Sequence, residues 1–262
     1  MDNSAHRIHE ALQVVARLHQ QRESDPSLAR ASVEVKRFQA RRFHAAYADL
    51  LRSPRYKTAA TFFLEELYSD KDYVERDQQF ARIASTIARL FPQAVVDTAA
   101  ALAEVHALTE ALDDQMAREW LADLAAMTTG GECARYIRCW RRLGDVAARQ
   151  RQLEVVIHLG QELDHLTRTR GLRTLLKMMR RPAAMAGLSS LQHFLETGFD
   201  AFAEMRGADE FLKVVSERES GWIGSLFDDE AAACETKLRH LLAADGTQRE
   251  DAAVNSPVVH SR

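Results

Sequence analysis

Apolar residues recur at helical spacing along almost the whole chain, and this pattern constrains the fold more than any other feature of the sequence. It is clearest between residues 73 and 91. The apolar residues there stand at positions i, i+3, i+4, i+7, i+10 and i+11; they are Phe80, Ile83, Ala84, Ile87, Leu90 and Phe91. That spacing places them on one face of an amphipathic α-helix.

Residues that interrupt regular structure are scarce. The 262 residues include only 11 glycines and 5 prolines, too few to separate the many short strands of a β-sandwich or barrel. The longest purely apolar run, Ala99–Ala103, is about five residues, whereas a membrane-spanning helix needs roughly 20. The first ten residues lack the apolar core of a signal peptide. We therefore predict an all-α fold in the cytoplasm: a compact multi-helix bundle of about ten helices with no sheet.

Turn-forming residues predict where helices end. The strongest interruption is Thr128-Thr129-Gly130-Gly131, which divides the chain into an N-terminal helical half, residues 1–129, and a C-terminal helical half, residues 132–244. In the first half the pattern predicts helices over 27–52, 54–68, 73–91, 92–112 and 113–127, the last capped by Asp113-Asp114. We expect the two halves to pack as one unit. Residues 245–262 have no apolar periodicity and are predicted to form a disordered tail.

The three cysteines, Cys133, Cys139 and Cys234, do not predict a disulfide framework or a zinc site. Their number is odd and no two of them form a CxxC pair. A structural zinc site needs four ligands, with a close cysteine pair in most cases. We expect three buried thiols in a reducing compartment.

One predicted helix, residues 145–169, carries a candidate metal site. Glu154, His158, Glu162 and His165 fall within roughly 80° of one another on this helix, and Glu162 and His165 have the ExxH spacing of carboxylate-bridged metal sites. The chain has no second ExxH, and the stripe lies opposite the apolar face that includes Val156. A solvated stripe is the favoured interpretation, and a metal-dependent enzyme using Glu162 and His165 is an alternative.

Basic residues gather on two predicted helical segments. The first group is Arg135, Arg138, Arg142 and Arg149, and the second is Arg173, Lys177, Arg180 and Arg181. The net charge of −3, with acidic residues interleaved, favours solvated helix faces over a nucleic-acid site. The sequence also lacks GxSxG, HExxH, GxGxxG and a glycine-rich phosphate loop, so no motif predicts catalysis.

The most distinctive string is FFLEELY, residues 62–68. It resembles an uncharacterised bacterial protein family that is named for this motif, and residues 191–202 are compatible with the same family. The resemblance implies no established activity. As a helix, the motif places Phe62 between Glu65 and Glu66, on the side expected to face solvent. This helix is either a central core helix or a partner-docking helix that binds another protein through Phe62, Glu65 and Glu66.

The short connection after this motif predicts its packing partner. Only about four residues separate the helix 54–68 from the helix 73–91, and sequential helices with short connections are usually neighbours. We therefore expect Phe63 and Leu67 to be buried against Phe80 and Ile83.

His106 continues an apolar stripe through Ala99 and Leu102, so it is either a hydrogen-bonded core histidine or a ligand. The aromatic motif, the acidic turn after it and this later histidine are similar to the second helix, corner and proximal histidine of globins. That resemblance implies a haem with His106 as the iron ligand and Tyr68 on the distal side. The chain departs from the globin pattern at Pro92, which interrupts the expected distal helix.

Together these observations favour a non-catalytic interaction or regulatory protein. Its expected partner is another protein, with no membrane partner, no nucleic acid and no cofactor. Two alternatives remain open: a binder of haem or of a small hydrophobic ligand that uses His106, and a helical-bundle metalloenzyme.

Overall fold

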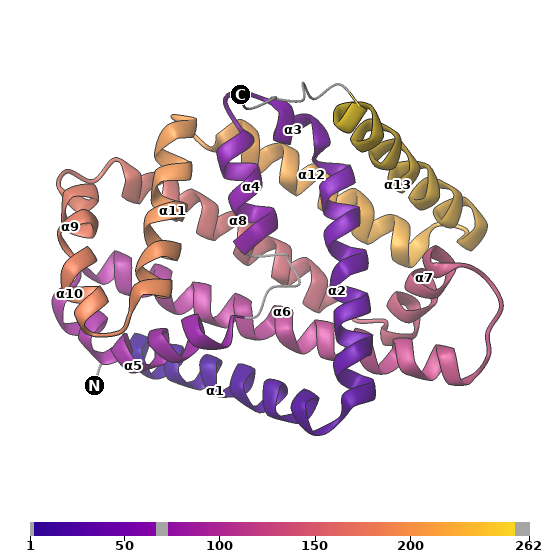
Figure 1. Ribbon diagram of the computed structural model, residues 1–262, viewed down its shortest axis with the longest axis horizontal. Coiled ribbons are helices and arrows are strands. Elements are labelled where there is room, and N and C mark those ends of the chain that lie inside the picture. The colour runs from indigo at the N-terminus through magenta and orange to yellow at the C-terminus, as the bar shows by residue number, and fades with distance from the viewer. Residues whose placement is uncertain (1–2, 67–72, 255–262) are drawn as a thin grey trace, which may run out of the picture.

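The computed structural model describes residues 3–66 and 73–254, which form helices and no strand (Figure 1). The predicted all-α fold is confirmed. The helices are α1 (Asn3–Ser24), α2 (Pro26–Ala46), α3 (Ala48–Arg52), α4 (Lys57–Glu66), α5 (Val74–Leu90), α6 (Gln93–Ala125), α7 (Glu132–Leu143), α8 (Val146–Thr167), α9 (Leu172–Met178), α10 (Arg180–Met185), α11 (Ser189–Met205), α12 (Asp209–Asp228) and α13 (Ala231–Val254). Within the described ranges, no helix has the length and apolar character needed to cross a membrane.

The 33-residue helix α6 lies at the centre, and α1, α2, α5, α7 and α8 pack against it. The predicted break at Asp113-Asp114 is wrong, because α6 runs through both residues. Both side chains are buried: Asp113 interacts with Gln39 of α2, and Asp114 accepts a hydrogen bond from Arg118 Nε at 2.8 Å. These aspartates therefore bind side chains from inside the helix instead of capping its backbone.

Local signals explain several helix ends. Asp25 caps α2 by accepting hydrogen bonds from the backbone N–H groups of Ser27 and Leu28, and Pro26 stands in the first turn, where proline is favoured. α7 ends at Gly144, whose φ of 65° is the left-handed conformation that favours glycine. Tyr47 interrupts the predicted helix 27–52, so that α2 and α3 are separate.

Two hydrophobic clusters form the core, and each contains residues from both predicted halves. The first joins α1, α4, α5 and α6 to α8, α11 and α12. The second joins α2 and α6 to α7, α12 and α13 around Trp120, Tyr136 and Trp140. The Gly130-Gly131 break lies in the loop between α6 and α7. Described helices from before and after this loop thus share each cluster, and α6 contributes to both.

Helix α4 carries the described part of the FFLEELY motif; Leu67 and Tyr68 lie outside the described residues. Phe63 is buried, as predicted, and its ring partners are Phe202 on α11 and Phe211 on α12, whereas we predicted packing against Phe80 and Ile83 of the helix 73–91. Phe62 does not face solvent as expected: it is 6% exposed, against 8% for Phe63. The reason lies on α11, where Gly198 leaves room for the Phe62 ring.

The last helix extends beyond its expected end. We expected the tail 245–262 to be disordered, whereas α13 continues to Val254. Residues 255–262 lie outside the described ranges.

Candidate functional site

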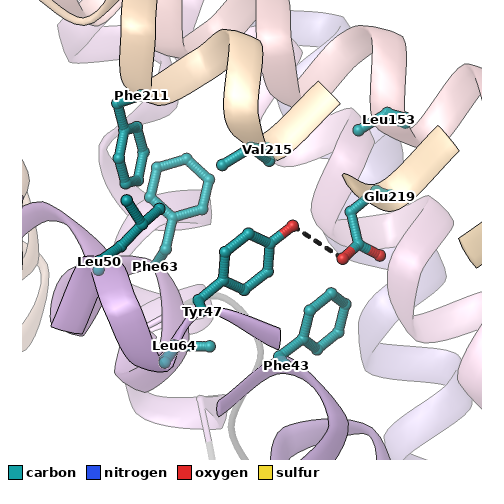
Figure 2. Close-up of a pocket in the computed structure, with 10 residues that line it drawn as sticks. Phe43, Tyr47, Leu50, Phe63, Leu64, Leu153, Phe211, Val215 and Glu219 are labelled. Carbon is teal, nitrogen blue, oxygen red and sulfur yellow. Dashed lines mark hydrogen bonds between the residues drawn. The ribbon is translucent and has the colours of Figure 1, made fainter. Parts of the chain in front are cut away.

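Two small adjoining cavities lie among α2, α8 and α12. The first, here called the apolar cavity, has a volume of about 30 Å³. Figure 2 shows its lining, which combines aromatic and aliphatic side chains from α2, α3, α4, α8 and α12. The lining residues are Phe43, Tyr47, Leu50, Ala60, Phe63, Leu64, Leu153, Phe211, Val215 and Glu219.

The second, here called the polar cavity, has a volume of about 40 Å³ and shares Phe43, Leu153 and Glu219 with the first. The remaining lining comes from α2, α6, α7, α8 and α12 and is mainly polar or charged. It consists of Gln39, Arg42, Thr109, Asp113, Tyr136, Trp140, Arg149, Gln152 and Ile223. Buried polar side chains are usually hydrogen-bonded in folded proteins, so the partners of each of these groups decide what the cavity can bind.

Glu219 stands at the junction of the two cavities and is held from both sides. Tyr47 Oη donates a hydrogen bond to Glu219 Oε1 at 2.8 Å, as Figure 2 shows, and Arg42 Nη2 donates to Oε2 at 2.7 Å. Burial opposes the charge of Arg42, but Glu219 outweighs it and raises the pKa of the guanidinium. Arg42 and Glu219 thus form a buried ion pair, which holds the Glu219 carboxylate in place where the two cavities adjoin.

Several polar groups of the lining bind one another. Gln152 Nε2 donates to Thr109 Oγ1 at 2.8 Å, and Arg149 Nη1 donates to Gln152 Oε1 at 3.3 Å. The Arg149 guanidinium also lies 4.5 Å from the centre of the Trp140 ring. Burial raises the pKa of Asp113, which faces the same cavity.

Three donors of the polar cavity lack an acceptor in good hydrogen-bond geometry in the part of the chain that the structure describes, although the Trp140 indole N–H lies close enough to the Tyr136 hydroxyl to act on its pKa. They are the Tyr136 hydroxyl, Trp140 Nε1 and Arg42 Nε. All three side chains are at least 95% buried. An unsatisfied buried donor costs about 1–3 kcal/mol. A ligand that accepts hydrogen bonds from these donors would remove that cost, which favours its binding. The sequence did not reveal this site, because the three residues lie on two helices and share no motif.

The first basic group is not a solvated face. Arg138 makes a two-pronged contact with Asp123 of α6, at 2.9 and 2.7 Å, and Arg142 and Arg135 reach the same carboxylate at 3.1 and 3.5 Å. The Asp123 side chain has no exposed surface, and the hydrogen bond from Arg138 helps to lower its pKa to about 2. Arg149 lies apart from this cluster and lines the polar cavity.

His106 has the hydrogen bond expected of a core histidine. Its Nε2 lies 2.8 Å from Asp77 Oδ2, its side chain is 15% exposed, and its ring meets the ring of Tyr73 edge-on. The proposed distal residue Tyr68 lies outside the described residues, so the structure does not test the globin-like site.

Glu162 and His165 are neighbours on the outer side of α8. Glu162 Oε1 lies 4.0 Å from His165 Nδ1, and the His165 side chain is 70% exposed. Among the described residues, no three His, Cys, Asp or Glu side chains come together as a metal site would require. The three cysteines are buried with free thiols, as expected for small core residues.

The exposure of His158 and His165 leads to a stability prediction. Since both histidines lie at the surface, changing both to alanine is expected to cost less than about 0.5 kcal/mol of unfolding free energy. Chemical denaturation of the double variant and the parent measures the difference. Loss of a stoichiometric metal ion in the double variant would instead support the metalloenzyme alternative.

The second basic group forms a surface at one end of the molecule, where α9 and α10 lie (Figure 1). Residues 168–187, here called the α9–α10 surface, contain six basic side chains and no acidic one: Arg168, Arg170, Arg173, Lys177, Arg180 and Arg181. Large apolar side chains project between them, with Leu175 39%, Met178 70% and Met185 85% exposed. Such a mixed patch is typical of a binding surface.

Comparison with known proteins gives one match. The model of a family described as "Domain of unknown function (DUF8198)" matches residues 18–233. This range includes both cavities, α6 and the α9–α10 surface. Neither a curated protein nor a solved structure matches the chain.

Proposed function

Since the chain belongs to the DUF8198 family of domains of unknown function, we propose a function from its own surface: a non-catalytic interaction protein that binds an acidic segment of another protein through the α9–α10 surface. The observation that carries this proposal is the stretch between Asp164 and Glu196, which has no acidic residue and in which Met178 and Met185 are 70% and 85% exposed. We also propose that the family is the bacterial one named for FFLEELY, and that the protein acts in the cytoplasm.

The charges of the surface support an acidic partner. Arg173 and Arg180 bind Asp200 and Glu196 of α11, at 2.8 and 2.5 Å. Arg170, Lys177 and Arg181 form no ion pair in the described part of the chain, and all three are exposed. Carboxylates of a partner can therefore pair with these three cations without displacing an existing contact.

The apolar part of the surface supports a protein partner over nucleic acid. Met178 and Met185 are unbranched and polarizable, and methionine-rich surfaces adapt to apolar side chains of different shapes. A single strand of nucleic acid would call for aromatic side chains to stack its bases, and residues 168–187 contain none. A lipid surface with uniform negative charge would also come close to the carboxylates of Glu196 and Asp200, which repel it. A peptide can instead place its acidic side chains away from these two residues.

A defined peptide tests the proposal. The probe is a fluorescent amphipathic helix with glutamates on one face and leucines on the other, and its binding is measured by anisotropy. Charge reversal in the double variant Lys177→Glu and Arg181→Glu is expected to weaken binding about tenfold or more, and so is Met178→Ser with Met185→Ser. Salt should weaken binding to the parent protein, because exposed charges are screened.

The control is Met127→Ser, which changes an equally exposed methionine outside this surface. It should leave peptide binding unchanged. Equal affinity in all variants would contradict the proposal. Stronger binding to phosphatidylserine vesicles than to the peptide would also contradict it and would identify a lipid partner.

Two alternatives stay predictions with a test of their own. An absorption spectrum and a metal analysis of the purified protein would show a Soret band if His106 binds haem, or stoichiometric iron or manganese if Glu162 and His165 hold a metal. Either result would replace the proposal of a purely interacting protein.

A further inference from the structure

The paired cavities point to a ligand that is independent of the α9–α10 surface. We propose that they bind a short-chain aliphatic carboxylate, with its carboxylate in the polar cavity and its hydrocarbon chain in the apolar cavity. The argument rests on the kind of polar group left without a partner, on the position of the apolar lining and on the available volume.

The unpartnered groups require an acceptor. Trp140 Nε1 and Arg42 Nε can only donate, and the Tyr136 hydroxyl can donate as well. A carboxylate offers two oxygens with about four acceptor sites, enough for three donors in one place. A primary amine would bring further donors and leave these groups unsatisfied.

The charge of the polar cavity suits an anion. Glu219 is already neutralised by Arg42, whose Nη2 lies 2.7 Å from it, and is further bound by the Tyr47 hydroxyl. Arg149 adds a positive charge to the same lining. Burial raises the pKa of Asp113, which reduces the negative charge that a bound carboxylate would face.

The apolar lining begins where the polar lining ends. Phe43 and Leu153 border both cavities, and beyond them Phe63, Phe211 and Val215 complete a surface without a free polar group. A hydrocarbon chain attached to the carboxylate would lie against these side chains and lose its contact with water, which is favourable.

The volumes limit the length of the ligand. A water molecule needs about 10–15 Å³ of such space. The volumes of about 40 and 30 Å³ therefore hold roughly three and two groups of that size. A carboxylate followed by two or three carbons, about five or six non-hydrogen atoms, fills both cavities. Longer fatty acids would require the helices to separate.

Butyrate is the probe that tests this inference. Thermal unfolding of the full chain and calorimetric titration are carried out with sodium butyrate, n-butylammonium chloride and butanol at constant ionic strength. Butyrate is expected to raise the melting temperature saturably, because a ligand that binds only the folded state stabilises it. Butylammonium and butanol should produce no saturable shift.

Two conservative variants locate the site. Trp140→Phe and Tyr136→Phe each remove one unpartnered donor and are expected to weaken butyrate binding about tenfold. Without butyrate, Tyr136→Phe should be no less stable than the parent, because it removes only the hydroxyl. Trp140→Phe also loses ring volume and the contact with Arg149, so its stability is compared with that of Trp120→Phe. Weaker butyrate binding by Tyr136→Phe without a loss of stability would distinguish a binding role of the hydroxyl from a structural one.

The matched control is Trp120→Phe. It removes an indole N–H that already donates to Glu34 at 2.8 Å, in a buried site outside both cavities. It should lower stability and leave the butyrate affinity unchanged. The inference is overturned if butyrate has no saturable effect at tens of millimolar, if butylammonium acts equally, or if Trp140→Phe and Tyr136→Phe bind butyrate like the parent.

Discussion

Replacing Phe62 by alanine is expected to lower the free energy of unfolding by about 3–5 kcal/mol, as much as replacing Phe63. Phe62 is 6% exposed, and its ring centre lies 5.5 Å from that of Phe194 on α11. Its loss leaves a cavity between α4 and α11 that the remaining side chains cannot fill without moving helices. Urea denaturation of both single variants, with far-UV circular dichroism to check the fold, measures the effect.

Gly198 provides a sharper form of this test. A Cβ atom at this position would lie 2.7 Å from Cζ of Phe62, closer than such atoms approach in folded proteins. Gly198→Ala alone should therefore cost about 1–3 kcal/mol. In the Phe62→Ala background the same methyl group enters empty space and should cost little or stabilise the protein.

A double-mutant cycle over Phe62 and Gly198 measures this coupling. We expect an interaction energy of about 1 kcal/mol or more, with the two changes less harmful together than their separate effects predict. Additive effects would mean that the two residues are not in contact. A Phe62→Ala variant as stable as the parent would support the hypothesis of a docking residue.

The second large effect is expected at Glu110, in the middle of α6. Its carboxylate binds Arg22 Nη2 and Lys36 Nζ, each at 2.5 Å, and the Glu110 side chain is 4% exposed. Glu110→Gln keeps the size of the side chain but leaves two buried cations without their anion. Breaking a buried ion pair from one side costs about 3–5 kcal/mol, and we expect a loss in that range.

Acid should remove part of the same stabilisation in the parent protein. Burial opposes the charge of Glu110, but Lys36 and Arg22 outweigh it and lower its pKa from 4.5 to about 2. A lowered carboxylate pKa stabilises the fold above about pH 4.5, and this contribution falls as the pH drops towards 2. The shift corresponds to roughly 3 kcal/mol. Stability measured between pH 5 and 2 should fall less steeply in Glu110→Gln.

Glu104→Gln is the matched control on the same helix. Glu104 binds Arg7 at 2.7 Å, but both side chains are at least one-third exposed. Exposed pairs contribute at most about 1 kcal/mol, so this variant should remain close to the parent. An equal loss at both positions would show that burial does not distinguish the two pairs.

The sequence predicted those parts of the fold that depend on neighbouring residues. α5 begins and ends within one residue of the predicted bounds 73–91, because Pro92 interrupts the helical pattern locally. It failed at Asp113, where the aspartate lies inside α6 instead of capping a new helix. Only the fold shows that Gln39, 74 positions earlier, interacts with this buried carboxylate.

The cavities were beyond prediction for the same reason. Their lining comes from helices far apart in the sequence, and no spacing rule connects Arg42, Tyr136 and Glu219. The α9–α10 surface, by contrast, is continuous in sequence. The sequence identified its basic residues. The inference failed because it used the net charge of the whole chain and not the local charge of a stretch that contains no acidic residue.

The central position of α6 has a consequence for synthesis. α1 packs mainly against α6, so its apolar face must wait until about 100 more residues have been made, or about 5–20 s at ordinary translation rates. The face of α2 that contacts α13 waits roughly twice as long. During that interval the nascent chain exposes unpaired amphipathic helices, the kind of apolar surface that makes an incompletely folded chain prone to aggregate.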